Sequence, residues 1–104
     1  MVPGAIPEEI FLELWPTIPA EFAEGFMNGG KFLAHSIGLV MDEAPVIARG
    51  FKAPLEAGMT FACEPKIALP GVGMVGTENT YEVVEQGAAR SLTGNILDLQ
   101  CIRE

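Results

Sequence analysis

Apolar and polar residues follow a helical spacing in the first part of the chain. Ile6, Ile10 and Leu14 recur every four residues, which puts them on one face of a helix. Pro7 suits the first turn of that helix, and Pro16 stops it because proline lacks the N–H that the next turn needs. The spacing therefore predicts a helix that begins near residue 6 and ends before residue 16.

A second, shorter helix is predicted over residues 20–27, with Phe22 and Phe26 on one face. The sequence Asn28-Gly29-Gly30 ends it, since asparagine and glycine tolerate the left-handed conformation at a helix C-terminus. The helical part of the chain is thus predicted to span residues 6–27.

From Lys31 onward, short apolar segments alternate with turn residues, a pattern typical of β-strands. Helices followed by antiparallel strands indicate an α+β fold, here one domain with a sheet over about residues 31–93 and a tail over 94–104. The predicted extended segments are residues 31–39, 46–48, 59–67 and 75–84, with a turn at 42–45 and a hairpin turn at 85–88 that returns through 89–92.

The 104 residues carry a net charge of -8, from 6 Lys+Arg and 14 Asp+Glu. This excess of acidic residues leaves no basic surface for a phosphate backbone and excludes nucleic acid as a partner. No stretch approaches about 20 apolar residues, and the first residues lack the features of a signal peptide, so we expect no membrane partner. Cys63 and Cys101 form no disulfide framework, and a cytoplasmic setting is expected.

Two glutamates and a histidine lie in predicted strands that are otherwise apolar. Glu64 follows the run Met59–Cys63, Glu78 lies within residues 75–84, and His35 has apolar residues on both sides. A buried carboxylate must pair with a cation or bind a metal, unless it turns to solvent. Imidazole nitrogen and carboxylate oxygen on neighbouring strands could coordinate a divalent metal. On spacing alone, a hydrogen-bonded core histidine is the more common arrangement, and a solvent-facing glutamate is at least as common as a ligand.

Five segments of the chain match one family pattern in order and in spacing. Over about residues 25–93 the sequence closely resembles the C-terminal part of the pita-bread metallopeptidases, which include prolidase, Xaa-Pro aminopeptidase, methionine aminopeptidase and creatinase. In that family the pattern runs H-G-I-G-L, H-E-A-P, L-x-x-G-M, E-P and E-D/N-T. The matching segments here are His35-Ser36-Ile37-Gly38-Leu39, Asp42-Glu43-Ala44-Pro45, Leu55-Glu56-Ala57-Gly58-Met59, Glu64-Pro65 and Glu78-Asn79-Thr80.

The resemblance implies half of a pita-bread fold and a dinuclear metal site. It makes His35, Glu64 and Glu78 metal ligands, for two divalent ions that are usually manganese, cobalt or zinc. Such ions activate a water for attack on a peptide carbonyl. The implied function is a metal-dependent Xaa-Pro peptidase acting on small peptides.

The family also uses two Asp ligands from strands earlier in the chain, and this sequence has no Asp before Asp42. Three of five ligands do not hold a normal dinuclear site. We therefore expect the chain to be a C-terminal fragment of a longer enzyme, catalytically inert by itself.

Three further departures affect the predicted activity. Asp42 stands where the peptidases usually carry a second histidine; it is the candidate catalytic residue, as a base, or it caps the turn. Gly76 replaces an arginine often found two residues before the last glutamate ligand, and Ser36 replaces a glycine after the histidine. These changes leave room for a non-peptidase member, a creatinase-like hydrolase or a lyase that cleaves dimethylsulfoniopropionate.

A third alternative is a metal-free half-fold that acts as a binding or assembly module. Two copies would then pair as a homodimer that mimics the missing half of the fold.

Overall fold

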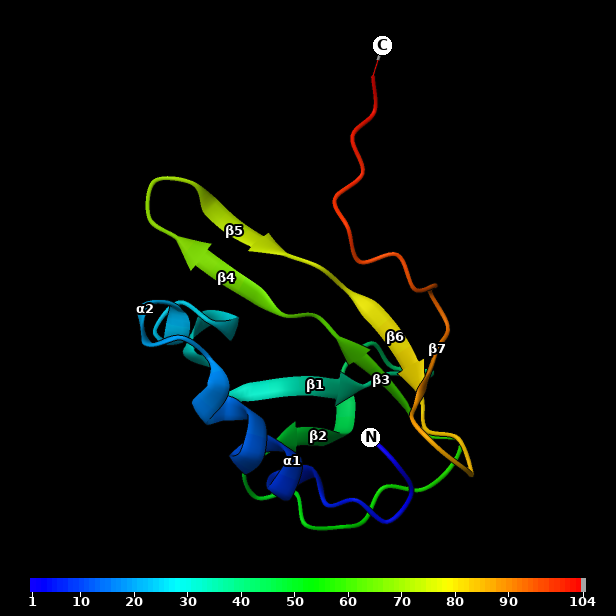
Figure 1. Cartoon of the computed structure of the whole chain (residues 1–104). Coiled ribbons are helices and arrows are strands. Elements are labelled where there is room, and N and C mark those ends of the chain that lie inside the picture. The colour runs from blue at the N-terminus through cyan, green and yellow to red at the C-terminus, as the bar shows by residue number, and fades with distance from the viewer. Residues whose placement is uncertain (104) are drawn as a thin grey trace.

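The computed structural model describes residues 1–103, apart from the side chain of Asn28. Short helices come first and antiparallel strands follow, and Figure 1 shows their arrangement. The helices are α1 (Pro7–Leu14), the 3-10 turn η1 (Trp15–Thr17), α2 (Ala20–Ala23) and η2 (Met27–Gly29). The strands are β1 (Phe32–Ser36), β2 (Glu43–Ala48), β3 (Thr60–Cys63), β4 (Lys66–Leu69), β5 (Gly73–Gly76), β6 (Asn79–Glu82) and β7 (Arg90–Ser91).

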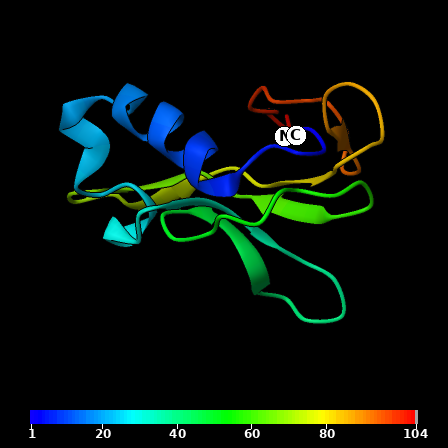
Figure 2. The same ribbon diagram turned by 90° about the horizontal axis from the view of Figure 1, so that it is seen from below.

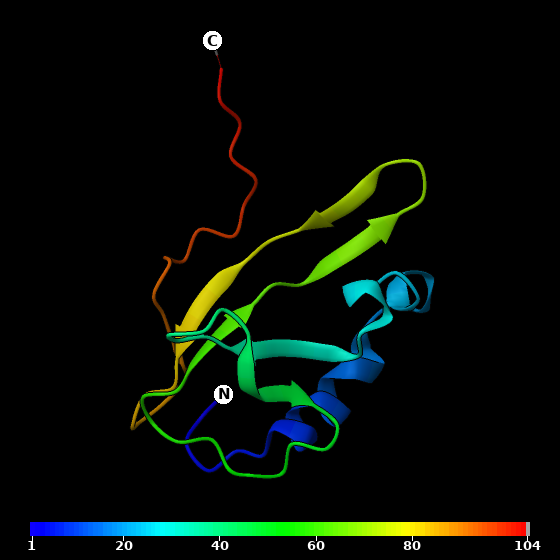
Figure 3. The same cartoon turned by 180° about the vertical axis from the view of Figure 1, so that it is seen from behind.

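The strands form a 5-stranded sheet in the order β2-β1-β3-β6-β7 and a 2-stranded sheet of β4 and β5. All neighbouring strands are antiparallel. Helices α1 and α2 lie on one side of the strands (Figure 2). Seen from behind, the β4–β5 hairpin extends beyond the 5-stranded sheet, and the residues after β7 extend away from both sheets (Figure 3). Among the helices within residues 1–103, none has the length and apolar character to cross a membrane.

The core lies between α1 and the larger sheet. Phe11 of α1 stacks on Trp15, with ring centroids 5.1 Å apart, and both rings cover the sheet. Burial of side chains of this size contributes roughly 1.5–3 kcal/mol each to folding. The buried core residues are Phe11, Ala34, Ile47, Leu55, Phe61 and Val83.

The apolar face predicted for the first helix is displaced by one residue from the face that is buried in the structure. Phe11 is 1% exposed, whereas Leu14 of the expected stripe is 47% exposed. Pro7 and Phe11 form the buried line instead, because the rotation of a helix is set by the surface it packs on.

The second helix is shorter than predicted and ends at Ala23. The chain after it joins the β4–β5 hairpin: the Ala68 N–H donates to the Gly25 carbonyl at 3.0 Å, and Phe26 forms a bridge with Ile67. A Cβ on Gly25 would lie 2.7 Å from the Ala68 oxygen, so only glycine allows this approach. Tertiary pairing has replaced the last turn of the predicted helix.

The strand predictions also need three corrections. Residues 59–67 and 75–84 each form two strands, with breaks at Glu64-Pro65 and at Thr77-Glu78. Proline has no N–H to donate and interrupts the first strand. The predicted turn at residues 42–45 is already strand from Glu43 onward, because β2 extends to pair with Ser36.

Candidate metal centre

The two breaks lie opposite each other in one long hairpin. Cys63 pairs with Asn79 before the breaks, and Lys66 pairs with Gly76 after them. The register is therefore unchanged across the gap, and the residues between these pairs face one another. Glu64 is opposite Glu78, and Pro65 is opposite Thr77, whose N–H donates to the Pro65 carbonyl at 3.2 Å.

Opposed residues of an antiparallel pair project from the same face of the sheet, as do residues two apart along a strand. Glu64 and Glu78 therefore share a face, and Lys66 lies on that face as well. A cavity of about 190 Å³ opens between these side chains. Glu78 is exposed and the side chain of Glu64 is 25% exposed, so solvent reaches both carboxylates. Like charges directly opposite each other are unfavourable, and a cation between them would relieve the repulsion. The cavity is lined by Glu64, Lys66, Met74, Gly76, Thr77 and Glu78.

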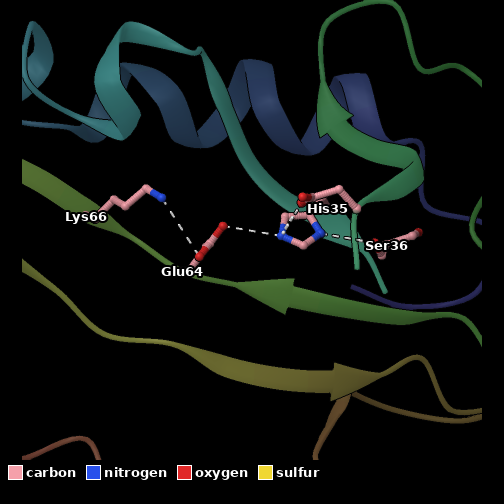
Figure 4. A network of polar contacts seen from close by, with 5 residues as sticks. His35, Ser36, Glu64 and Lys66 are labelled. Carbon is pink, nitrogen blue, oxygen red and sulfur yellow. Dashed lines mark hydrogen bonds and ion pairs between the residues drawn. The ribbon is translucent and has the colours of Figure 1, made fainter. Parts of the chain in front are cut away.

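His35 comes to the same face from β1. Its backbone pairs with Ala62 of β3, two residues before Glu64. The residue is only 7% exposed, and its Nε2 lies 3.3 Å from Oε1 of Glu64 (Figure 4).

The other ring nitrogen of His35 fixes the tautomer. Nδ1 lies 3.0 Å from the Ser36 carbonyl oxygen, which only accepts hydrogen bonds, so Nδ1 carries a hydrogen. In the neutral imidazole, Nε2 then carries no hydrogen, and its lone pair points toward the carboxylate of Glu64. This backbone-tethered arrangement is typical of histidines that bind metal through Nε2.

Asp42 adds a second carboxylate at the same nitrogen. Its Oδ1 lies 3.0 Å from His35 Nε2, and its side chain is 69% exposed on the segment between β1 and β2. A single nitrogen that faces two carboxylate oxygens needs a proton or a cation between them. The sequence left the role of Asp42 open, and the structure adds that its carboxylate reaches the candidate ligand His35.

Ser36, which follows His35, is 6% exposed, and its hydroxyl oxygen finds no hydrogen-bond partner within the described part of the chain. Its carbonyl, not its hydroxyl, serves the site by holding the ring of His35. Gly76, the other departure, lies in the cavity beside Lys66.

The donor set fits part of a divalent metal site. An imidazole nitrogen and carboxylate oxygens are ligands that zinc, cobalt and manganese accept. Glu64 contacts His35 on one side and faces Glu78 on the other. As the side chains stand within residues 1–103, no three His, Cys, Asp or Glu residues are arranged to hold an ion by themselves.

Residues 1–85 match metallopeptidase family M24. The chain belongs to this family. It is 38% identical over 91 residues to the Xaa-Pro dipeptidase of Pyrococcus furiosus, a match that covers 85% of this chain and 25% of the relative. It is 40% identical over 55 residues to the Xaa-Pro dipeptidase of Lactobacillus delbrueckii subsp. lactis, covering 53% of this chain and 15% of that one.

Solved structures of family members share the fold. Dipeptidase PepE from Mycobacterium ulcerans superposes with a TM-score of 0.77 and 32% identity, over 94% of this chain and 26% of that chain. The Xaa-Pro dipeptidase from Bacillus anthracis gives a TM-score of 0.77 and 30% identity, over 95% of this chain and 27% of that chain. The predicted α+β fold, the C-terminal part of a pita-bread fold, is confirmed. The chain spans about a quarter of the length of these relatives.

Sequence reasoning selected His35, Glu64 and Glu78, and the structure brings the first two into contact and sets the third opposite Glu64. It missed Lys66. The signal was available, since Lys66 is two residues beyond Glu64 and so shares its face in an extended chain.

Proposed function

We propose that this chain supplies the C-terminal metal ligands of a metallopeptidase that hydrolyses Xaa-Pro dipeptides. His35, Glu64 and Glu78 are the residues that would hold the divalent ions. The opposed pair of Glu64 and Glu78 carries the proposal, together with the 3.3 Å contact between Glu64 and His35 Nε2. Opposed carboxylates repel each other, and a divalent cation between them would turn this repulsion into attraction.

Manganese, cobalt or zinc would, when bound, lower the pKa of a coordinated water and polarise the peptide carbonyl. The protein's part is to fix the donors in advance. The Ser36 carbonyl holds the imidazole ring, and the register of the hairpin holds the two carboxylates face to face. Two Asp ligands have to be added to these three, so the 104 residues by themselves are proposed to be inactive.

A peptide substrate is supported by the surface beside His35. A cavity of about 360 Å³ adjoins the ring, within the range of small-molecule sites. Phe32, Ala44 and Val46 give its wall an apolar character that suits a proline ring. The Xaa-Pro dipeptidases of Pyrococcus furiosus and Lactobacillus delbrueckii are the named relatives that support this substrate class.

A chimera tests the proposal. This chain replaces the matching quarter of the Pyrococcus furiosus enzyme, and release of proline from Xaa-Pro dipeptides is measured with added Mn²⁺. We expect hydrolysis, and a loss of about 100-fold or more on Glu78→Gln, because removing outer partners of ligands alone costs about 10- to 100-fold. Glu56→Gln, an exposed glutamate outside both cavities, is the matched control. A folded, metal-loaded chimera that leaves every Xaa-Pro dipeptide intact would refute the peptidase assignment.

Asp42 favours a second candidate, a hydrolase or lyase that acts on a small non-peptide substrate. Its carboxylate lies 3.0 Å from His35 Nε2, where the resembling peptidases carry a histidine. Asp42→His in the chimera separates the two. The first proposal expects peptide hydrolysis to rise, whereas the second expects activity on the non-peptide substrate to be lost.

A further inference from the structure

Position 76 lacks the arginine that the family resemblance predicts there, and the structure explains why. Gly76 pairs directly with Lys66 across the β4–β5 hairpin. A Cβ on residue 76 would lie 2.6 Å from the Lys66 Cβ and 2.8 Å from the Pro65 carbonyl oxygen. Opposed Cβ atoms normally keep about 4.5–5.5 Å. The Lys66 Cβ and the Pro65 carbonyl oxygen occupy the space, so any side chain at residue 76 would require this part of the hairpin to shift.

A positive charge is nevertheless present in the cavity, because Lys66 on the opposite strand, β4, carries it. Nζ of Lys66 lies 4.0 Å from Oε2 of Glu64, while the other oxygen of Glu64 faces His35. Lys66 also lines the cavity that Glu64 and Glu78 share. Its side chain is 33% exposed, which leaves the ammonium free to move toward solvent.

We propose that Lys66, on β4, is the counter-ion of the Glu64–Glu78 pair and supplies the positive charge that the family pattern places at residue 76. A divalent cation then displaces the ammonium of Lys66. The inference rests on the proposed function in so far as Glu64 and Glu78 receive the ion. An ammonium beside Glu64 lowers the repulsion between the carboxylates, and it also repels an incoming cation. Metal affinity should then depend on how many positive side chains occupy the cavity, whichever strand carries them.

Mn²⁺ titration of the 104-residue chain, followed by paramagnetic broadening of amide signals near residues 64 and 78, measures this affinity even when binding is weak. Lys66→Met removes the charge, and we expect the Kd for Mn²⁺ to fall about threefold at low salt and by less at roughly 0.5 M salt. Lys66→Gln repeats the test with a polar side chain. Lys66→Arg keeps the charge and should keep the wild-type Kd.

Moving the charge is the sharper test. Gly76→Arg alone adds a second cation and should raise the Kd, and the steric conflict should lower the stability of the hairpin. The double variant Lys66→Gly with Gly76→Arg relocates the charge and removes the contact with the Lys66 Cβ, while the Pro65 carbonyl oxygen still lies 2.8 Å from the new Cβ. Circular dichroism therefore checks that the double variant is folded, and the Kd of the folded variant should return to the wild-type value. Lys52→Met is the matched control, because Lys52 makes a similar 3.9 Å ion pair with Glu8 elsewhere on the chain.

An unchanged or higher Kd in both Lys66→Met and Lys66→Gln would overturn the counter-ion role. If Glu78→Gln still abolishes binding in that case, the proposed metal centre stands without it. Binding that survives both Glu64→Gln and Glu78→Gln would instead overturn the proposed metal centre. A wild-type chain that shows no broadening at any Mn²⁺ concentration would overturn the displacement of Lys66 by a cation in this chain, whereas the proposed metal centre, which needs two further Asp ligands, is tested by the chimera.

Discussion

Replacing Ser36 by alanine should make the protein more stable. The hydroxyl of Ser36 is buried without a hydrogen-bond partner in the described residues, and the side chain is only 6% exposed. A buried polar group that loses water without gaining a partner costs about 1–3 kcal/mol. Alanine keeps the Cβ and removes only the oxygen, whose few dispersion contacts are worth about 0.1–0.2 kcal/mol each.

The net gain in the free energy of unfolding is therefore about 1 kcal/mol. For a chain of this length that corresponds to a rise in Tm of about 4–8 °C. Urea unfolding followed by circular dichroism measures it, and an unchanged m-value shows that the denatured state is the same. Ser36→Gly, which restores the residue expected from the family pattern, should be about 0.5–1 kcal/mol less stable than Ser36→Ala because glycine weakens a strand.

Ser91→Ala is the control. The hydroxyl of Ser91 donates to the Gly94 carbonyl at 2.6 Å, so its removal should lower stability by about 0.5–1.5 kcal/mol. The reasoning fails if Ser36→Ala also lowers stability, since the hydroxyl of Ser36 would then have a favourable partner.

One further substitution and one chemical modification test the packing. Phe61→Ala should lower the free energy of unfolding by about 3–5 kcal/mol, because Phe61 is 0% exposed in the core; chemical denaturation that shows less than 1 kcal/mol would contradict this packing. Burial raises the pKa of the Cys63 thiol, which the positive amino terminus offsets in part. Iodoacetamide at pH 7 should therefore alkylate the exposed Cys101 first, with Cys63 reacting faster only as the pH rises and its thiolate forms; equal labelling by mass spectrometry at pH 7 would argue against the burial.

Local sequence signals were enough for the order of the elements and for the hairpin of β6 and β7. Pro16 correctly predicted where α1 ends, and the alternation of apolar segments with turn residues predicted the extended segments. What they could not predict is the rotation of α1, because the choice of Phe11 over Leu14 depends on the sheet surface beneath the helix. The early end of α2 likewise depends on the hydrogen bond between Gly25 and Ala68, whose partners are far apart in sequence.

In the candidate site, too, some residues could be identified from local sequence, whereas the position of others depends on the fold. Glu64 and Glu78 were selected because a carboxylate in an otherwise apolar strand needs a cation, a metal or solvent beside it. The neighbouring residues in the sequence are enough to recognise such a carboxylate. The spacing from Glu64 placed Lys66 on the same face, but its position opposite Gly76 in the cavity depends on the register of β4 and β5. Asp42 was selected as the candidate catalytic residue, but its contact with His35 depends on the path of the chain between β1 and β2.

The unbroken register of the long hairpin has a consequence for the order of folding. Glu64 and Glu78 come together as soon as the hairpin closes, a local event with a timescale of about 1–10 μs. His35 joins them when β1 pairs with β3, which closes a loop about twice as long at an extra entropic cost of about 0.6 kcal/mol. Two carboxylates thus meet before the histidine arrives, and Lys66 is the cation present at that moment. We expect its charge to affect the folding rate, in addition to the native state, so that Lys66→Met slows hairpin closure most in water of low ionic strength.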